Sequence, residues 1–311
     1  MSAALPAPDI GSRCEFQTYH KTVRKDGEKV VKPVTDPFKA DDIRNDDDAY
    51  ALVVERDFAN KEGGHGSVTL KVNSPHLLEA FRQIIKSYPT VSSDFSKPFR
   101  LSSPFQMLMH WWPELDAHRK EAEDAVVRMH LNLLFEFLDF ELGPAREKIM
   151  ATVREGQITY FNAWVLFRPG DLVYTKVLGE PWLLRCQKTA YEVSNTRGPY
   201  LEVHCTFTDH DGTDVGEAKH KITIYQKRQF GQENPAVIAE LPVFPRRFVT
   251  GKDDVELEEK LTKRGEKFLA HMEVSVQEYD GIAHFLKEPP YSYWHPDMAD
   301  FDGVWLPYTV R

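Results

Sequence analysis

The spacing of apolar positions changes from a helical period to a strand-like period along the chain. Between Ser74 and Pro89 the apolar side chains recur with the helical period, at Leu77, Leu78, Phe81, Ile84, Ile85 and Tyr88. Ser74 is a favourable N-cap residue, and Pro75 suits the first helical position because its missing N–H costs nothing there. The pattern therefore predicts a helix that begins after Ser74 and stops at Pro89.

A helical pattern continues from Ser103 to Glu155. Pro104 opens a short helix and Pro113 ends it, before the charged segment from Glu114 to Asp124. A longer apolar helix follows, and Gly143 is predicted to supply its left-handed C-cap. We expect these helices to form a layer that covers a sheet.

Period-two alternation predicts strands on both sides of this helical stretch. Two predicted strands, Ala49 to Arg56 and Ser67 to Val72, precede it. Four follow it, at Asp171 to Val177, Trp182 to Val193, Tyr200 to Thr208 and Lys219 to Tyr225. Their regular spacing and the turn-forming residues between them indicate an antiparallel meander or a partly closed barrel. The predicted fold class is α+β, with this meander or barrel packed against the helical layer.

The same patterns divide the chain into four parts. Residues 1–48 combine low hydrophobicity with high charge and are predicted to be a flexible tail, in which Cys14 to Tyr19 could add an edge strand. Residues 49–168 form a strand pair plus a helical subdomain. Residues 169–285 form the meander or barrel with a C-terminal amphipathic helix. Residues 286–311 are an aromatic, proline-containing segment.

Composition and charge narrow the classes of partner. The chain has 311 residues, of which 41% are apolar and 28% are charged, as in ordinary globular proteins. Its 39 basic and 48 acidic side chains give a formal net charge of −9. Nucleic acids and anionic membranes attract clustered positive charge, so we expect neither as a partner.

The cysteine content indicates a reducing compartment. Cys14, Cys186 and Cys205 are too few and too scattered for the disulfide framework of a small secreted protein. We therefore expect reduced thiols and a location in the cytoplasm or nucleus.

The sequence contains no recognisable catalytic motif. The segment Asp209 to Asp214 suggests a calcium loop, but its glycine stands at the fourth position rather than the sixth. Zinc ligands or a Cys–His nucleophile could be sought among Cys186, His204, Cys205, His210 and His220. His204 and Cys205 are adjacent and would point to opposite faces of a strand, which argues against a shared site. We therefore predict no catalytic residue, no metal ligand and no cofactor, although the question of enzyme activity stays open.

Two adjacent tryptophans are the predicted partner-binding residues. Trp111 and Trp112 are successive positions of a predicted helix, where neighbours point in different directions and cannot both face fully inward. One of them is expected to lie at the surface as a binding anchor. Phe105, on the same short helix, is included in this predicted site.

Several short segments occur in an order typical of a known family. They are Ser74-Pro75-His76-Leu77-Leu78-Glu79-Ala80, Leu134-Phe135-Glu136-Phe137-Leu138, Glu141-Leu142-Gly143-Pro144, Leu166-Phe167-Arg168-Pro169-Gly170-Asp171-Leu172-Val173, Leu241-Pro242-Val243-Phe244-Pro245, Arg264-Gly265-Glu266-Lys267-Phe268 and Tyr279-Asp280-Gly281-Ile282-Ala283. In this order they resemble the amino-terminal region of large fungal AAA-type ATPases, which carries a domain of unknown function ahead of the ATPase module.

This resemblance implies a noncatalytic module that recognises a protein partner or substrate for an attached ATPase. The family's nucleotide-binding motifs lie further toward the carboxyl terminus, so no ATP-binding residue carries over to this sequence. The isolated chain is then expected to be a monomer or a weak dimer.

Two other functions fit the sequence as well. The chain could be a self-standing protein-binding scaffold that uses the predicted barrel and the tryptophan helix. It could also be a small-molecule enzyme in which His204 or His220 acts as acid and base.

Overall fold

The computed structural model describes residues 9–23, 29–33, 47–58, 67–91, 94–177, 179–210, 214–231, 234–250, 252–272, 281–286 and 305–310. The chain divides into two compact units. The first comprises Met1–Asp209 and Val215–Glu258, and the second comprises His210–Asp214 and Glu259–Arg311.

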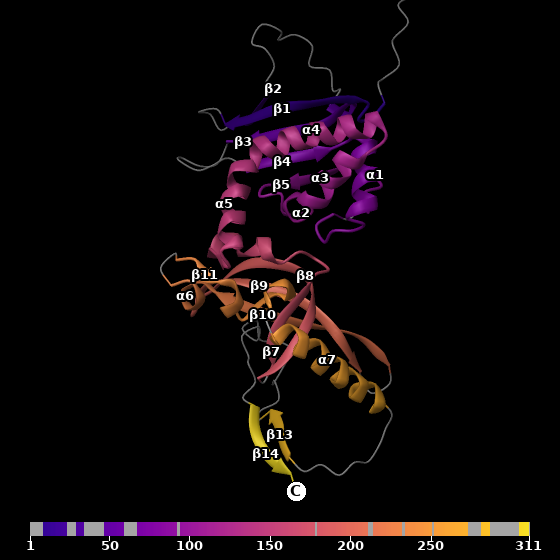
Figure 1. Ribbon diagram of the computed structural model, residues 1–311. Coiled ribbons are helices and arrows are strands. Elements are labelled where there is room, and N and C mark those ends of the chain that lie inside the picture. The colour runs from indigo at the N-terminus through magenta and orange to yellow at the C-terminus, as the bar shows by residue number, and fades with distance from the viewer. Residues whose placement is uncertain are drawn as a thin grey trace, which may run out of the picture. The chain divides into compact units, whose positions relative to one another are not determined.

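The first unit contains a five-stranded mixed sheet in the order β2-β1-β3-β4-β5 (Figure 1). Its strands are β1 (Arg13–Val23), β2 (Lys29–Pro33), β3 (Tyr50–Asp57), β4 (Ser67–Val72) and β5 (Phe99–Ser102). β1 runs parallel to β3, and the other neighbouring pairs are antiparallel. The two strands predicted before the helical stretch are confirmed as β3 and β4.

The strand allowed at Cys14 to Tyr19 is part of β1, but the flexible tail predicted for the rest of residues 1–48 is wrong for the remainder of β1 and for β2. β1 is also an interior strand rather than an edge, because it lies between β2 and β3. Ladder hydrogen bonds to two neighbours offset the ordering cost that low hydrophobicity implies. Just before β1, Gly11 donates its N–H to the Asp48 carbonyl at 2.7 Å. Its φ of +68° and a space in which a Cβ would lie 2.5 Å from the Asn73 carbonyl oxygen both require glycine.

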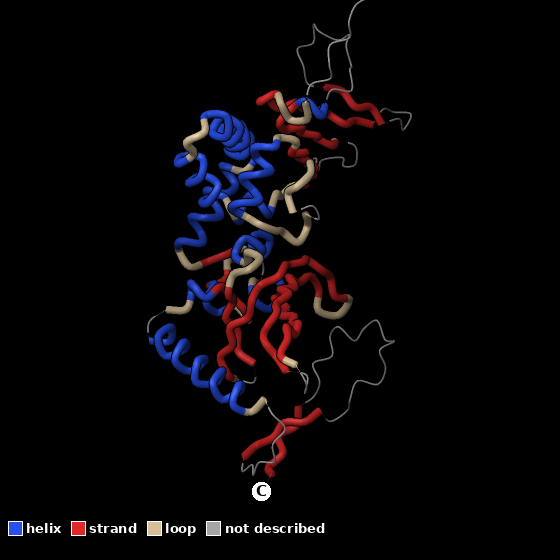
Figure 2. Tube along the Cα trace, turned by 90° about the vertical axis from the view of Figure 1, so that its right-hand side faces the viewer, coloured by secondary structure: helices blue, strands red, loops and turns tan. Residues whose placement is uncertain are grey.

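Helices cover one face of this sheet, as Figures 1 and 2 show for α1 to α4. The helices are α1 (Pro75–Ile84), α2 (Gln106–His110), α3 (Trp112–Glu121), α4 (Ala125–Glu141) and α5 (Gly143–Arg154). The first hydrophobic core lies between the sheet and these helices, with Leu70 from β4, Phe81 from α1 and Leu134 from α4 among its fully buried side chains. The predicted N-cap is confirmed, because the Ser74 hydroxyl accepts a hydrogen bond from the Leu77 N–H at 3.2 Å.

Several helix boundaries differ from those predicted. α1 ends at Ile84, with Ile85 as its C-cap, rather than at Pro89. Pro113 lies in the first turn of α3 rather than ending a helix, because a proline in that turn gives up no intrahelical hydrogen bond. The charged segment after it is therefore helical. Gly143 is the first residue of α5 and not a left-handed C-cap. The cap of α4 is Leu142, whose N–H donates to the Leu138 carbonyl.

The second sheet of this unit has the order β10-β9-β8-β7-β12 (Figure 1). Its strands are β7 (Leu172–Val177), β8 (Glu180–Ser194), β9 (Gly198–His210), β10 (Val215–Tyr225) and β12 (Val243–Pro245). The predicted meander is confirmed, and the sheet stays open over the described residues instead of closing into a barrel. The α+β fold class is thus confirmed.

Short elements complete the first unit. They are η1 (Asp47–Ala49), β6 (Gln157–Ile158), η2 (Tyr160–Leu166), α6 (Gln226–Gln229), β11 (Ala236–Val237), η3 (Ile238–Glu240) and η4 (Arg246–Phe248). A second hydrophobic core forms around the second sheet, with Leu184, Val203, Ile224 and Val243 fully buried. The described residues of this unit therefore hold two large cores and a small cluster of Met109, Trp164 and Val165. The second core includes residues from Ile158 to Phe167, so it begins before the predicted boundary at residue 168.

The second unit holds the end of α7 (Lys252–Ala270) and an antiparallel pair formed by β13 (Gly281–Leu286) and β14 (Trp305–Val310). The predicted C-terminal helix is confirmed as α7. Residues 211–213, in the segment that suggested a calcium loop, lie outside the described residues. None of the described helices is both long and apolar enough to cross a membrane.

Candidate functional site

The predicted partner-binding residues are buried. Trp111 is 9% exposed, Trp112 is 8% exposed and Phe105 is 1% exposed. The expectation that one indole lies at the surface is therefore wrong. A partner-binding role for these three residues stays a prediction, and it would require the surrounding structure to open.

Both tryptophans can be buried because the chain breaks between α2 and α3. Trp111 is the residue between the two helices, with φ −104° and ψ 15°, so it and Trp112 do not follow each other on one helix. Each indole can then be covered from its own side. The Arg168 guanidinium lies 5.3 Å from the centre of the Trp111 ring, and that of Arg146 lies 4.7 Å from the Trp112 ring. Cation–π contacts with these guanidinium groups, together with the aliphatic stems of the arginines, shield both rings from water.

A buried polar cluster joins the two cores. His110, at the end of α2, is 9% exposed. Its Nε2 lies 3.2 Å from the Trp164 carbonyl oxygen, and its Nδ1 lies 3.4 Å from the Tyr88 hydroxyl. A carbonyl only accepts, so Nε2 carries the proton and Nδ1 accepts from Tyr88. This arrangement suits the neutral imidazole and ties the first core to η2 beside the second.

Arg168 is the charged member of this junction. Its Nη1 donates to Glu114 on α3, and its Nε donates to Asp171 Oδ1 at 2.9 Å. Asp171 also faces Arg247 on η4, with 3.5 Å between its Oδ2 and the Arg247 Nη1. Glu114 belongs to α3 beside the first core, whereas Asp171 and Arg247 lie beside the second. Arg168 therefore links the cores by charge-assisted hydrogen bonds.

The buried thiols and imidazoles are poorly suited to catalysis. Burial raises the pKa of the Cys186 thiol strongly and that of Cys205 to about 12. Burial lowers the pKa of His110 to about 4. Nucleophilic catalysis by cysteine needs the thiolate, and a general base works best with a pKa near the working pH. Burial therefore keeps the two thiols protonated and moves the pKa of His110 below the working range of a general base.

Ser74 and His130 form a Ser–His pair that no sequence pattern indicated. The Ser74 hydroxyl lies 2.8 Å from His130 Nδ1, and both side chains are almost fully buried. The same hydroxyl accepts the Leu77 N–H as the N-cap of α1. The geometry makes this pair a structural anchor between α1 and α4, because a substrate would have no access to it.

The residues considered for zinc separate in the structure. Cys186 and Cys205 are neighbours in the second core. His204 lies on the other face of β9, where its Nε2 is 2.6 Å from Glu202 Oε2. Among the described residues, no three His, Cys, Asp or Glu side chains are grouped as metal ligands would be.

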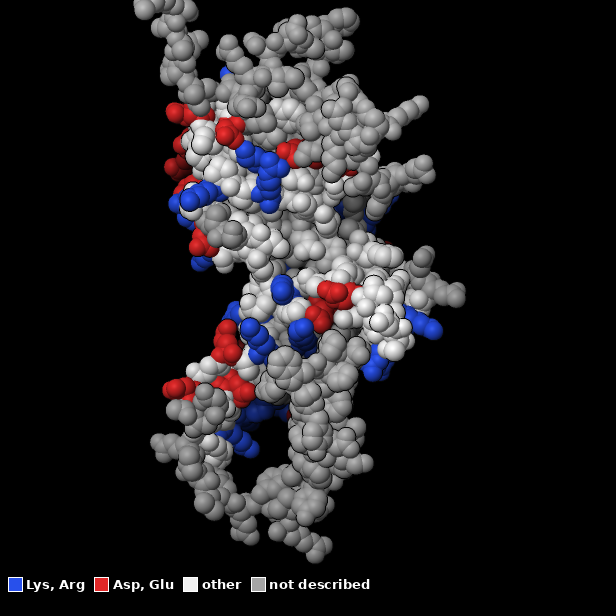
Figure 3. Space-filling view, turned by 180° about the vertical axis from the view of Figure 1, so that it is seen from behind, with Lys and Arg blue, Asp and Glu red and all other residues white. Residues whose placement is uncertain are grey.

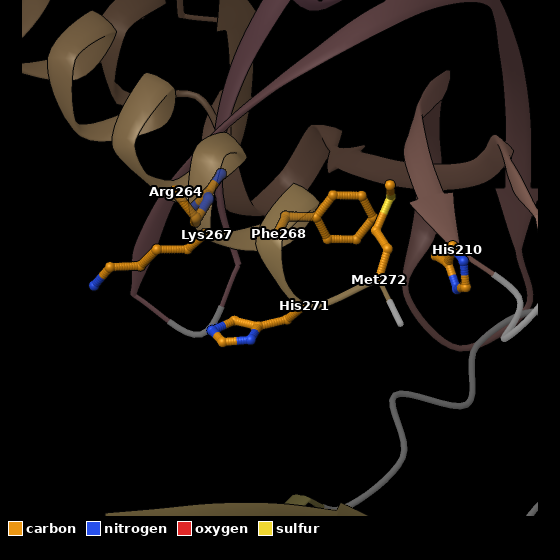
Figure 4. A pocket seen from close by; sticks show the side chains of 6 residues that line it. All are labelled: His210, Arg264, Lys267, Phe268, His271 and Met272. Carbon is orange, nitrogen blue, oxygen red and sulfur yellow. The ribbon is translucent and has the colours of Figure 1, made fainter. Parts of the chain in front are cut away.

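An open pocket of about 280 Å³ lies in the second unit. It is lined by His210, Arg264, Lys267, Phe268, His271 and Met272. Figure 4 shows Phe268 and Met272 projecting toward His210, whereas Lys267 extends away. Neither His204 nor His220, the predicted acid–base candidates, lines this pocket. Its lining combines basic and apolar side chains.

An apolar stripe on α4 is a surface that the sequence analysis missed. Val126 is 43% exposed, Met129 is 50% exposed and Phe140 is 77% exposed, and Leu133 is half-buried between them. These four residues, which we call the α4 surface, fall within a sector of about 60° around the helix axis. The inward face of α4 includes Leu131, Leu134 and Leu138, and the half-buried Leu133 also packs against the first core. α4 thus carries apolar residues on two faces. The second apolar face, visible in the helical periodicity of the sequence, is the signal that would have identified the α4 surface.

Charges frame the C-terminal end of the α4 surface. The Arg56 guanidinium lies 5.8 Å from the centre of the Phe140 ring, and its Nη2 donates to Glu141 Oε2 at 2.6 Å. Glu136 and Asp139 are exposed on the same turns of α4. Figure 3 shows the molecule from behind relative to Figure 1. On this side, acidic and basic side chains are interspersed among uncharged ones.

The neutral His110 predicts a pH-dependent stability. Its pKa is about 4 in the folded protein and about 6.5 in an unfolded chain, so the unfolded state binds more protons at low pH. The free energy of unfolding should therefore fall by about 2 kcal/mol between pH 7.5 and pH 5 through this residue alone. Denaturant titrations of His110→Gln should show a smaller loss over this range than those of the wild type.

His118→Gln, a substitution on α3 outside the cluster, is the matched control. Burial also lowers the pKa of His130, His204 and His220, which add losses of the same sign to all three proteins. Equal pH dependence in the wild type and His110→Gln would show that His110 is not held neutral by the fold.

Comparison with known proteins gives one partial match. Residues 148–250, about a third of the chain, match a family described as a domain of unknown function (DUF7025). The match includes η2, the second sheet and most of the second core. No curated protein and no solved structure matches the chain. The description of the domain states no activity, so the relation to AAA-type ATPases inferred from the sequence stays a prediction.

Proposed function

We propose that this chain is a noncatalytic protein-recognition module that binds its partner through the α4 surface. The observation that carries the proposal is the exposure of Val126, Met129 and Phe140 on one helix face. Exposed apolar side chains grouped on one face mark interaction sites more often than scattered ones do. Phe140 is a large aromatic side chain with most of its surface open to a partner, and aromatic residues often dominate binding energy.

The chemistry of the interior supports recognition over catalysis. The buried thiols have raised pKa values, and the buried His110 has a lowered one. The Ser74–His130 pair is enclosed and already serves as an N-cap. These groups are therefore satisfied parts of the two cores, whereas the α4 surface is exposed to solvent.

The geometry also favours one kind of partner. A straight stripe on a helix pairs well with another amphipathic helix, which contacts it through apolar residues at helical spacing. Glu136 and Asp139 lie beside the C-terminal end of the stripe. The partner helix is therefore proposed to carry lysine or arginine next to its apolar residues, because opposite charges improve encounter and register.

We further propose that the module serves an AAA-type ATPase of the fungal family that the sequence resembles. The ordered segments from Ser74 to Ala283 support this step, and the partial match to a domain of unknown function agrees with an uncharacterised amino-terminal module. In this role the chain selects the protein that the ATPase remodels. The module itself is proposed to need no cofactor, and to act in the cytoplasm or nucleus.

Substitutions on the α4 surface test the recognition role. Met129→Ser and Phe140→Ser remove exposed apolar side chains, so the fold should persist. Affinity purification from the source organism, followed by titration of the purified partner, should show a Kd weakened about 30-fold by the Phe140 substitution. Val193→Ser is the matched control, because Val193 is 72% exposed but lies on β8.

An unchanged Kd for the double variant Met129→Ser, Phe140→Ser would remove the α4 surface from the proposal. A Kd weakened equally by Val193→Ser would mean that the partner contacts a different or larger surface.

The delivery role has a separate test. The messenger RNA read downstream of codon 311 should encode a Gly-x-x-x-x-Gly-Lys-Ser/Thr loop in the same frame. A stop codon without such a loop would contradict delivery to an attached ATPase and would favour the self-standing scaffold.

A further inference from the structure

Cys186 on β8 and Cys205 on β9 are directly opposite each other in the second sheet. Side chains of opposite residues in an antiparallel pair lie on the same face. Both thiols are fully buried members of the second core, so that face is the inner one. The two sulfur atoms are therefore neighbours in a region closed to bulk water.

The backbone hydrogen bonds define which kind of pair this is. The Cys186 N–H donates to the Asp171 carbonyl at 2.9 Å, and the Cys186 carbonyl accepts from the Gly170 N–H at 2.8 Å. Both groups of Cys186 thus point toward the β7 side of β8 and away from β9. Cys186 and Cys205 are consequently a non-hydrogen-bonded pair, the kind in which opposite Cα atoms approach to about 4.5 Å.

This separation falls inside the range that a disulfide bond spans, about 4.4 to 6.8 Å between Cα atoms. A register shift in β8 between Cys186 and Lys188 lies immediately beside the pair. Such a bulge leaves one residue unpaired and locally disrupts the hydrogen bonds of the ladder. Closing the bond would therefore need little movement of the backbone.

We propose that Cys186 and Cys205 form a reversible cross-strand disulfide, a modification site within the second core that responds to peroxide. One thiolate attacks the O–O bond of hydrogen peroxide, which gives a sulfenic acid and releases water after proton transfer. The second thiolate then attacks the sulfenic sulfur, the S–S bond forms and a second water leaves. The peroxide is reduced and the two thiols are oxidised, so atoms and electrons balance.

The buried position of the two cysteines determines how fast the disulfide forms and what it does to the sheet. Burial raises the pKa of both thiols, so the reaction waits on transient opening of the sheet and is slow. Once formed, the bond joins β8 to β9 beside the bulge and holds their register. In a reducing compartment such bonds are transient and often report oxidation.

Peptide mapping of the full chain tests this proposal. Cys14→Ser leaves the proposed pair as the remaining cysteines and prevents links through Cys14. The folded variant is treated with hydrogen peroxide, free thiols are blocked, and trypsin is added without reductant. Cleavage releases Cys186 in residues 186–188 and Cys205 in residues 198–219. These two peptides should appear linked, with the mass of their sum less two hydrogen atoms, and reductant should separate them.

A second measurement distinguishes the folded geometry from chance reaction. The linked peptide should form at least about tenfold more abundantly per oxidised thiol in the folded chain than in denaturant, where a flexible chain segment separates the two cysteines. The unfolding midpoint of the oxidised protein should also rise. Cys205→Ala in the same background is the control and should give no linked peptide.

Two results would overturn the proposal. One is peroxide treatment that converts the thiols to sulfinic acid without linking them. The other is thiols that stay reduced in the folded chain under conditions that oxidise them in the unfolded one.

Discussion

The structure of the first unit depends on how Arg168 is held between the two hydrophobic cores. This guanidinium reaches Glu114 on α3 and Asp171 before β7, and it covers the Trp111 ring. His110 adds the hydrogen bond to the Trp164 carbonyl. Removing one partner would leave a partly buried charge without compensation, which costs more than the pair itself contributes. The cores are therefore coupled by polar groups that must stay paired or neutral.

This coupling explains why the conspicuous residues are not the exposed ones. The tryptophans that suggested a binding surface are used to build the junction, and the cysteines that suggested chemistry help to fill the second core. The outer face of α4 is the surface that we propose for a partner, and the inner face of this helix packs against the first core. Recognition of a partner through the α4 surface is our proposal.

The sequence predicts individual helices and strands better than it predicts which of them pair or pack together. The helix after Ser74, the strands of the meander and α7 follow from local periodicity and capping, and the structure has each of them. β1 was foreseen only as a possible edge strand at Cys14 to Tyr19, because its pairing with β2 and β3 leaves no local signal in the sequence. Trp111 was misplaced because a one-residue break between helices cancels the angular argument. The α4 surface could have been found by following Phe140 and Met129 around the helix axis.

Calorimetry tests most directly the claim that the junction joins both cores into one cooperative unit. Thermal unfolding of the wild type should give a single transition for the first unit, with equal calorimetric and van't Hoff enthalpies. Arg168→Met should split this transition into two, whereas Arg100→Met, which removes an ion pair to Glu55 inside the first sheet, should leave it single. A wild type that already unfolds in two steps, or an Arg168→Met profile that stays single, would contradict the account.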